Sequence, residues 1–247
     1  MNFTVYKHNW DKFDDNPVTA ELLSTVISAC EKIPFFIWPN KTNKSAKSKD
    51  HCFLQSVVNA WMEAELVGAG WDAEVAFKTG RNVRTDFGAP VTRDKKCLVE
   101  VEFGNQARID SDLRKLLDAY HWGMLQFGIV ILPRSQLAAI TTGGCATYEQ
   151  AVADVSSCHP KTVPFPVCII GLDQRNCPAV DLSQSKLTNP DTLSGNSNKV
   201  VLHHIVSEYR AGVCLSEIAM PTGLEELEII QKRSLRCNES PHQCALF

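Results

Sequence analysis

The sequence lacks the features of a membrane-spanning or an exported protein. It contains no apolar run of about 18 residues, which is the length that a transmembrane helix needs. Its first residues, Met1 to Lys7, do not form a charged segment followed by an apolar one, so no secretory signal is expected. An apolar content of 44% and a charged content of 21% are ordinary for a globular protein with a sizeable core. We therefore expect a soluble cytoplasmic protein without a membrane partner.

Closely spaced cysteine pairs are also absent. The chain contains ten cysteines, and no two of them are separated by only two residues. Structural zinc sites usually need such pairs, because a short loop must present two ligands to one ion. Cys158 and His159 come nearest to a ligand pair, but adjacent residues rarely point at the same ion. The pattern favours reduced thiols over zinc ligands.

An excess of positive charge is missing as well, since the net charge is -3. This sum does not exclude a nucleic-acid partner, because the distribution of charge over the surface matters more. Metal-binding carboxylates can hide a basic face. The polar stretch 40–50 carries four lysines that could reach a phosphate backbone or could belong to a solvated linker.

The order of apolar segments indicates an α/β protein, with helices packed on a central mixed β-sheet. Helices are expected over 16–30, 51–67, 110–120, 148–155 and 223–236. Strands are expected over 35–38, 71–78, 83–88, 97–104, 127–132, 167–172 and 199–206. Residues 173–198, rich in Asn, Ser, Pro and Asp, are expected to form a long surface excursion.

The strand predicted over 97–104 carries two acidic residues on one face. Side chains alternate between the faces of a strand, so Glu100 and Glu102 point to the side opposite Val99 and Val101. Two acids on a strand usually form nothing more than its solvated face. Here, however, a third acid, Asp86, lies on the preceding strand, and a hairpin can bring it alongside. Three converging carboxylates repel one another unless a hard cation lies between them, which predicts a Mg²⁺ site.

The run from Asp86 through thirteen residues to Glu100-Val101-Glu102 resembles the PD-(D/E)xK nuclease motif, in the variant that has glutamate in place of lysine. The segment VEVEFGN at 99–105, followed by the helix around 112–116 and the strand 128–131, resembles the BamHI/BglII-type Type II restriction endonucleases. The helix 51–66 is similar to the one that precedes the catalytic sheet there. The resemblance covers 53–133. The motif's proline is replaced by Thr85.

This resemblance implies a restriction-endonuclease-like core. The chain would form a single domain over 1–247, with the catalytic core at about 51–172 and recognition or dimerisation elements in 173–247. It would act as a homodimer that hydrolyses double-stranded DNA at a specific, palindromic site. The expected source is prokaryotic or phage-encoded, with a cognate DNA methyltransferase in the same system but not stably bound.

The resemblance also implies roles for the acids. The residues matching Asp86 and Glu100 hold Mg²⁺, for which Mn²⁺ can substitute. Glu102 orients or deprotonates the attacking water, and whether one or two ions act is left open. A fourth acid often comes from the preceding helix; Glu63 is the candidate, with Glu65 as its rival.

Six residues near the acids are candidates for DNA contacts. Basic side chains bind the backbone without reading sequence, whereas side chains at groove edges read bases. Asn105 and Arg108 could equally cap and flank the next helix. The candidates are Lys78, Arg81, Arg84, Asn105, Arg108 and Lys115.

Two other functions remain open from the sequence. One is a repair or phage nuclease of the same superfamily with low sequence specificity. The other is a non-catalytic DNA-binding module on a nuclease fold, which the intact acids argue against. The sequence does not define the recognition site, the position of the cut or the dimer interface.

Overall fold

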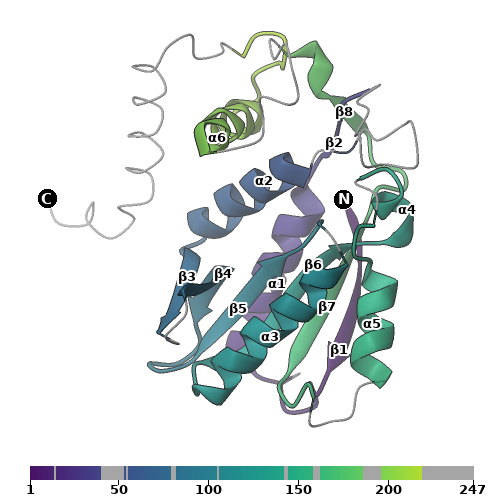
Figure 1. Cartoon of the computed structure of the whole chain (residues 1–247). Helices are drawn as coiled ribbons and strands as arrows, with labels where there is room; N and C mark the ends of the chain where they lie inside the picture. The colour runs from purple at the N-terminus through teal and green to yellow at the C-terminus, as the bar shows by residue number, and fades with distance from the viewer. Residues whose placement is uncertain are drawn as a thin grey trace, which may run out of the picture.

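The computed structural model of the chain describes residues 1–13, 15–39, 53, 55–78, 82–104, 106–141, 144–157, 162–185 and 196–218 (Figure 1). Its centre is a six-stranded sheet in the order β1-β7-β6-β5-β4-β3. The strands are β1 (Asn2–His8), β3 (Asp72–Lys78), β4 (Asn82–Pro90), β5 (Lys96–Val101), β6 (Leu125–Pro133) and β7 (Val167–Asp173). The sheet is mixed, because β5, β6 and β7 are parallel and the other neighbours are antiparallel.

Helices cover both faces of this sheet (Figure 1). One apolar layer packs α1 and α2 against the sheet, and the other packs α3 and α5 against the opposite face. The expected architecture, a central mixed sheet flanked by helices, is confirmed. The helices are α1 (Pro17–Lys32), α2 (Gln55–Gly68), α3 (Ala107–His121), α4 (Ser135–Ala138), α5 (Tyr148–Ser157) and α6 (Asn196–Arg210).

Local signals in the sequence explain two of these elements. Asn16 caps α1, because its side chain accepts a hydrogen bond of 3.1 Å from Thr19 N, and Pro17 occupies the first turn, where it costs no hydrogen bond. Strand β6 is buried on both faces: Ile129 packs with the α1/α2 layer, whereas Val130 packs with the α3/α5 layer. The continuous apolar run therefore forms the doubly covered strand that the sequence predicted.

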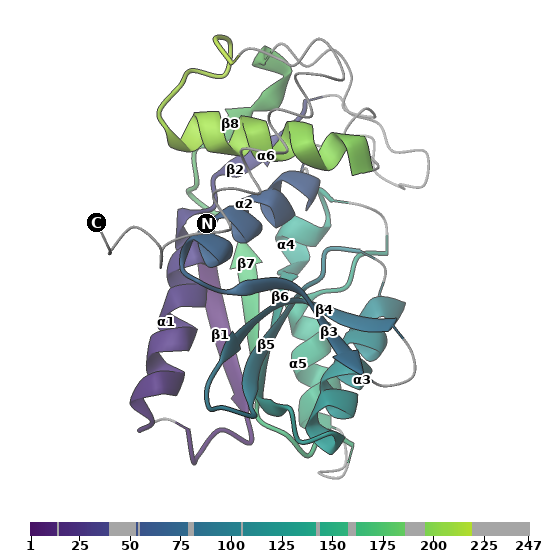
Figure 2. The ribbon, with the colours of Figure 1, turned by 90° about the vertical axis from the view of Figure 1, so that its left-hand side faces the viewer.

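The strand predicted over 199–206 is wrong, because this segment belongs to α6. Leu202, Ile205 and Val206 repeat at helical spacing and are buried in the layer that contains α2. A high content of β-branched residues favoured a strand, and packing against α2 overrode that preference. Figure 2 shows α6 lying across α2. The helix predicted over 223–236 lies outside the described residues.

Two further segments differ from the expectation. The start of the surface excursion instead contains β8 (Ala179–Asp181), which pairs in parallel with β2 (Phe35–Ile37), and a short 3-10 helix in which Leu182 is buried. Strand β1 was not predicted; it is partly exposed and pairs antiparallel with β7. Such short or edge strands depend on their partner strands more than on their own pattern.

Among the described residues, no helix is both long enough and apolar enough to cross a membrane.

Candidate active site

Strands β4 and β5 bring the three predicted acids together. Phe87 is paired with Val99 in this antiparallel ladder, so Asp86 and Glu100 are the next residues across from each other. The backbone N–H of Val101 donates a hydrogen bond of 2.8 Å to Asp86 Oδ2. Asp86, Glu100 and Glu102 all line one cavity of about 250 Å³. The shared face and the hairpin neighbour that the sequence predicted are both present.

Burial makes Glu100 the most perturbed of these acids. Its side chain is only 2% exposed. Burial, together with the charges of Asp86 and Asp112, raises the pKa of Glu100 to about 9, against the opposing effect of Lys115. Burial likewise raises the pKa of Asp86, of Glu102 and of Asp112. Without a further cation, Glu100 therefore retains its proton at neutral pH.

Helix α3 adds three charged side chains to the same cavity, Arg108, Asp112 and Lys115. Lys115 Nζ lies 2.7 Å from Asp112 Oδ1 and 3.1 Å from Glu100 Oε1, and it donates a hydrogen bond of 3.1 Å to Glu100 Oε2. Burial by itself would lower the pKa of Lys115, but the charge of Glu100 and the contact with Asp112 outweigh it and raise this pKa. Lys115 is thus an ammonium group at neutral pH, inside the acidic cavity.

Glu102 is held by the backbone just beyond β5. Its Oε1 accepts a hydrogen bond from Gly104 N, and its Oε2 lies 3.9 Å from Arg108 Nη1. A Cβ atom at position 104 would lie 2.5 Å from Glu102 Oε1, so a side chain there would displace the carboxylate. Glycine at 104 is therefore required for the close approach that orients Glu102.

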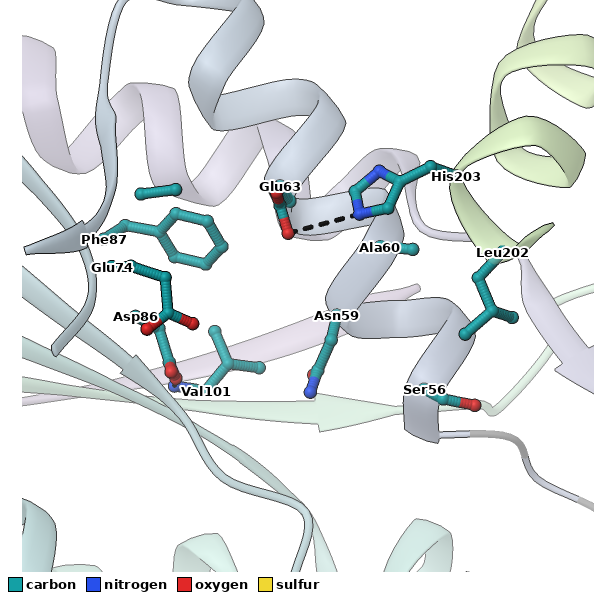
Figure 3. A pocket seen from close by; sticks show the side chains of 11 residues that line it. Ser56, Asn59, Ala60, Glu63, Glu74, Asp86, Phe87, Val101, Leu202 and His203 are labelled. Atoms are coloured by element: carbon teal, nitrogen blue, oxygen red, sulfur yellow. Dashed lines mark hydrogen bonds and ion pairs between the residues drawn. The ribbon is translucent and has the colours of Figure 1, made fainter. Parts of the chain in front are cut away.

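A second cavity, of about 290 Å³, adjoins the first through Asp86, Val101 and Asn59. Figure 3 shows Glu63 of α2 directed toward His203 of α6, whose Nε2 lies 3.3 Å from Glu63 Oε2, with Asp86 on the opposite wall. Helix α6, from the C-terminal part of the chain, thereby contributes to the surroundings of Asp86.

The structure separates the two candidates for a fourth acid. Glu63 shares the second cavity with Asp86, although it does not line the cavity that contains Glu100 and Glu102. Glu65 points elsewhere, because its carboxylate lies 2.6 Å from Arg210 Nη2 and 3.1 Å from Lys32 Nζ. Glu65 therefore joins α1, α2 and α6 and does not line either cavity.

The candidates for DNA contacts occupy different surroundings. Arg84 is exposed and lies 3.8 Å from Glu74, and Arg108 is 69% exposed at the mouth of the acidic cavity. Lys115 lies inside that cavity and not on the outer surface. The described part of the structure does not include the other three candidates, which are the side chain of Lys78, Arg81 and Asn105.

Sequence reasoning missed four residues of the acidic cavity, Gln55, Asn59, Ser111 and Asp112. Asp112 is 3% exposed and lies on the buried face of α3 with Ile109 and Leu116. Its place on that face was a usable signal, since an acid at an apolar helical position needs a partner. Asn59 of α2 lines both cavities, and its exposed position on a helix gave no such signal.

The oxygen atoms of the acidic cavity fit Mg²⁺ by their chemistry. Within the described ranges, no group of three or more His, Cys, Asp or Glu side chains is arranged to hold a metal ion. Mg²⁺, however, is usually bound by one or two carboxylates together with substrate phosphate oxygens. Asp86 and Glu100 provide two carboxylates, and Glu100 Oε1 is a buried atom that accepts no hydrogen bond. This donor set fits that mode of binding.

Comparison with known proteins identifies relatives of the chain. The family model described as "Restriction endonuclease BglII/BglIII" matches residues 16–172. The structure of restriction endonuclease BglII in complex with a DNA 16-mer is similar in fold, with a TM-score of 0.59 and 20% identity over 70% of this chain and 78% of that one. Free BglII gives a TM-score of 0.49 and 21% identity over 70% of this chain and 80% of that one. No curated protein matches significantly.

Proposed function

The chain belongs to the restriction endonuclease BglII/BglIII family, and on this basis we propose that it cuts double-stranded DNA at a palindromic site with Mg²⁺ as its cofactor. The family defines the enzyme class, a type II site-specific deoxyribonuclease. One observation supports the proposal of a Mg²⁺-dependent reaction: Asp86, Glu100 and Glu102 line a single cavity next to basic side chains. The negative charges of these three acids would repel a phosphate group unless a cation lay between them.

Each acid has a proposed part in hydrolysis. Asp86 and Glu100 would hold Mg²⁺, or Mn²⁺ in its place, which supplies positive charge to the scissile phosphate and makes water more acidic. Glu102 orients the attacking water and accepts its proton, because its carboxylate is fixed by Gly104 N and its pKa is raised by burial. Attack in line with the leaving oxygen then produces a 5′-phosphate and a 3′-hydroxyl.

The partner that we propose is double-stranded DNA, bound by a homodimer. The BglII structure of similar fold was determined with a DNA 16-mer. Two-fold symmetry of the protein would match two-fold symmetry of the site. We further propose that the chain forms one domain in which the part from 173 onward contributes to recognition or dimerisation. The cognate methyltransferase would protect the same site without binding stably. Contacts with DNA are assigned to Lys78, Arg81, Arg84, Asn105, Arg108 and Lys115.

Digestion of phage DNA tests the proposal directly. Incubation with Mg²⁺ should produce discrete bands, and chelator should abolish them. A smear of fragments would instead support a low-specificity nuclease of repair or phage origin. Intact DNA whose mobility shifts in a gel would support a non-catalytic DNA-binding module.

Metal binding should depend steeply on pH. Glu100 must lose a proton whose pKa is about 9 before it can act as a ligand, so affinity for Mg²⁺ should rise about tenfold per unit from pH 7 to 8 and level off above about 9. Calorimetry in buffers of different ionisation enthalpy would measure both the affinity and the proton released. Affinity that is constant between pH 6 and 9 would contradict this assignment.

The same pKa affects the stability of the metal-free protein. Folding raises the pKa of Glu100 from 4.5 to about 9. Between pH 4.5 and 9, the folded protein therefore binds one proton that the unfolded protein does not bind. This contribution to stability is complete below about pH 4.5 and is lost as pH rises through about 9. Denaturant unfolding of the metal-free protein should therefore show decreasing stability from pH 5 to 9, and Glu100→Gln should reduce that decrease.

The two candidates for a fourth acid should give opposite results. Glu63→Gln should slow cleavage by about tenfold with little change in melting temperature, because Glu63 shares a cavity with Asp86. Glu65→Gln should instead destabilise the fold by about 1–2 kcal/mol, because it weakens the contacts with Arg210 and Lys32. Cleavage rates and melting curves of both variants check this, and equal cleavage rates would remove Glu63 from the site.

A further inference from the structure

Lys115 of helix α3 places its ammonium group in the cavity that contains the acids of the nuclease motif. In the commoner form of that motif a lysine follows the second acid on the same strand, and here that position is Glu102. Lys115 is thirteen residues further along the chain, yet it lines the same cavity as Asp86 and Glu102. The cavity therefore lacks a strand lysine but contains a lysine from another element.

The contacts of Lys115 leave it able to bind a further oxygen atom. A lysine ammonium group has three N–H donors. Two contacts are with carboxylates, Asp112 at 2.7 Å and Glu100 at 3.1 Å. The side chain is 28% exposed, so it is not closed off from the cavity. A third donor thus remains for an anion that enters beside Glu100.

The packing of α3 fixes where Lys115 can reach. Leu116, the next residue, is fully buried against Gly128 of β6, where a Cβ atom would lie 2.7 Å from Leu116 Cδ1. Ile109 and Ala119 are buried on the same side of the helix. Asp112, one turn before Lys115, holds its ammonium group toward Glu100. The lysine is therefore held in place by the helix and by Asp112, as a preorganised electrostatic group must be.

Arg108 is a poorer source of this positive charge. It lines the same cavity, but its side chain is 69% exposed and its Nη1 lies 3.9 Å from Glu102 Oε2. An exposed guanidinium at the mouth is screened by water, whereas a half-buried ammonium acts at lower effective dielectric.

We propose that Lys115 is a catalytic residue, which donates a hydrogen bond to a non-bridging oxygen of the phosphate being cleaved. It supplies from α3 the positive charge that the commoner motif takes from a strand lysine, and Asp112 is the positioning residue that holds it there. This inference rests on the proposed function, because it requires a phosphate in the acidic cavity.

Three variants of α3 test the proposal. Lys115→Met removes the charge and keeps much of the volume, Lys115→Arg keeps the charge, and Arg114→Met is the matched control, because Arg114 is exposed and does not line the cavity. In single-turnover cleavage of phage DNA with Mg²⁺, Lys115→Met should be slower by about a hundredfold to a thousandfold, the usual loss when one preorganised donor is removed. Lys115→Arg should lose less, and Arg114→Met should match the wild type.

The salt dependence of DNA binding separates a phosphate contact from a purely structural role. With Ca²⁺ in place of Mg²⁺, the slope of log affinity against log salt concentration should become shallower by about 0.9 per active site in Lys115→Met. A lysine that only neutralised Glu100 and Asp112 would leave this slope unchanged. An unchanged slope, or cleavage by Lys115→Met within about threefold of the wild type, would overturn the proposal.

A charge-balanced double variant covers the case in which Lys115→Met does not fold. Combining Lys115→Met with Asp112→Asn removes one positive and one negative charge from the cluster. This protein should show the same loss of cleavage and the same shallower slope, whereas Asp112→Asn alone should retain the slope. If the double variant keeps the wild-type slope, or cleaves within about threefold of the wild type, the proposal is wrong. Wild-type protein that cuts no DNA would overturn the proposed function as well, which distinguishes the two failures.

Discussion

Asp86→Ala and Glu100→Ala should each reduce single-turnover cleavage by about a thousandfold or more, while affinity for DNA changes by only a few fold. Both carboxylates line the cavity in which Mg²⁺ is proposed to bind, and either loss leaves at most one of the two proposed ligands. Neither side chain offers positive charge to the DNA backbone, so its removal does not weaken phosphate contacts. Quenched-flow cleavage at saturating enzyme, and binding measured with Ca²⁺, would separate the two effects.

Asp72→Ala is the matched control for these variants. Asp72 is an acid on the adjacent strand β3, but its side chain is 63% exposed and lies 3.0 Å from Lys96, away from the cavity. It should cleave like the wild type. Asp86→Ala or Glu100→Ala enzyme with wild-type rates would show that the assigned cavity is not where hydrolysis takes place.

Glu102→Lys should be impaired by about a hundredfold or more, although it recreates the commoner motif. Glu102 is 6% exposed, and its carboxylate accepts a hydrogen bond from Gly104 N, which a lysine cannot replace because it has no acceptor. The new ammonium group would also share the cavity with Lys115 and Arg108, and like charges at low dielectric repel strongly. The variant further loses the group proposed to accept the proton from water.

Comparison with Glu102→Gln separates these causes. Glutamine keeps an acceptor for Gly104 N and adds no charge, so this variant should bind Mg²⁺ as the wild type does and still cleave slowly. Single-turnover rates are needed, so that weaker DNA binding is not mistaken for slower chemistry. Glu102→Lys enzyme as active as the wild type would show that Glu102 has no role as a base and that this position tolerates either charge.

Local sequence patterns were enough to predict that Asp86, Glu100 and Glu102 lie together, as their shared cavity shows. The period of two along a strand places Glu100 and Glu102 on one face, whatever the strand packs against. The short turn after β4 then places Asp86 across from Glu100, because Phe87 pairs with Val99. The doubly buried β6 was equally readable, because a long run of apolar residues tolerates no exposed face.

Patterns over a few residues failed where packing between distant segments decides the structure. Residues 199–206 have the β-branched content of a strand, yet the apolar surface of α2 favours a helix that places Leu202, Ile205 and Val206 on one side. Strand β8 forms because β2, far away in the sequence, offers it a parallel partner. Neither partner is visible within a window of a few residues.

The sequence by itself determined which acids share a strand face, because side chains alternate between the two faces of any strand. It also determined the fold class, because the spacing of apolar residues differs between helices and strands. Only the tertiary structure decided what surrounds those acids. Lys115 contacts both Glu100 and Asp112 because Leu116 packs on Gly128 and fixes α3 against the sheet. His203 reaches Glu63 because α6 lies on α2. Distances between side chains of different elements depend on how those elements pack, and a linear pattern does not contain that information.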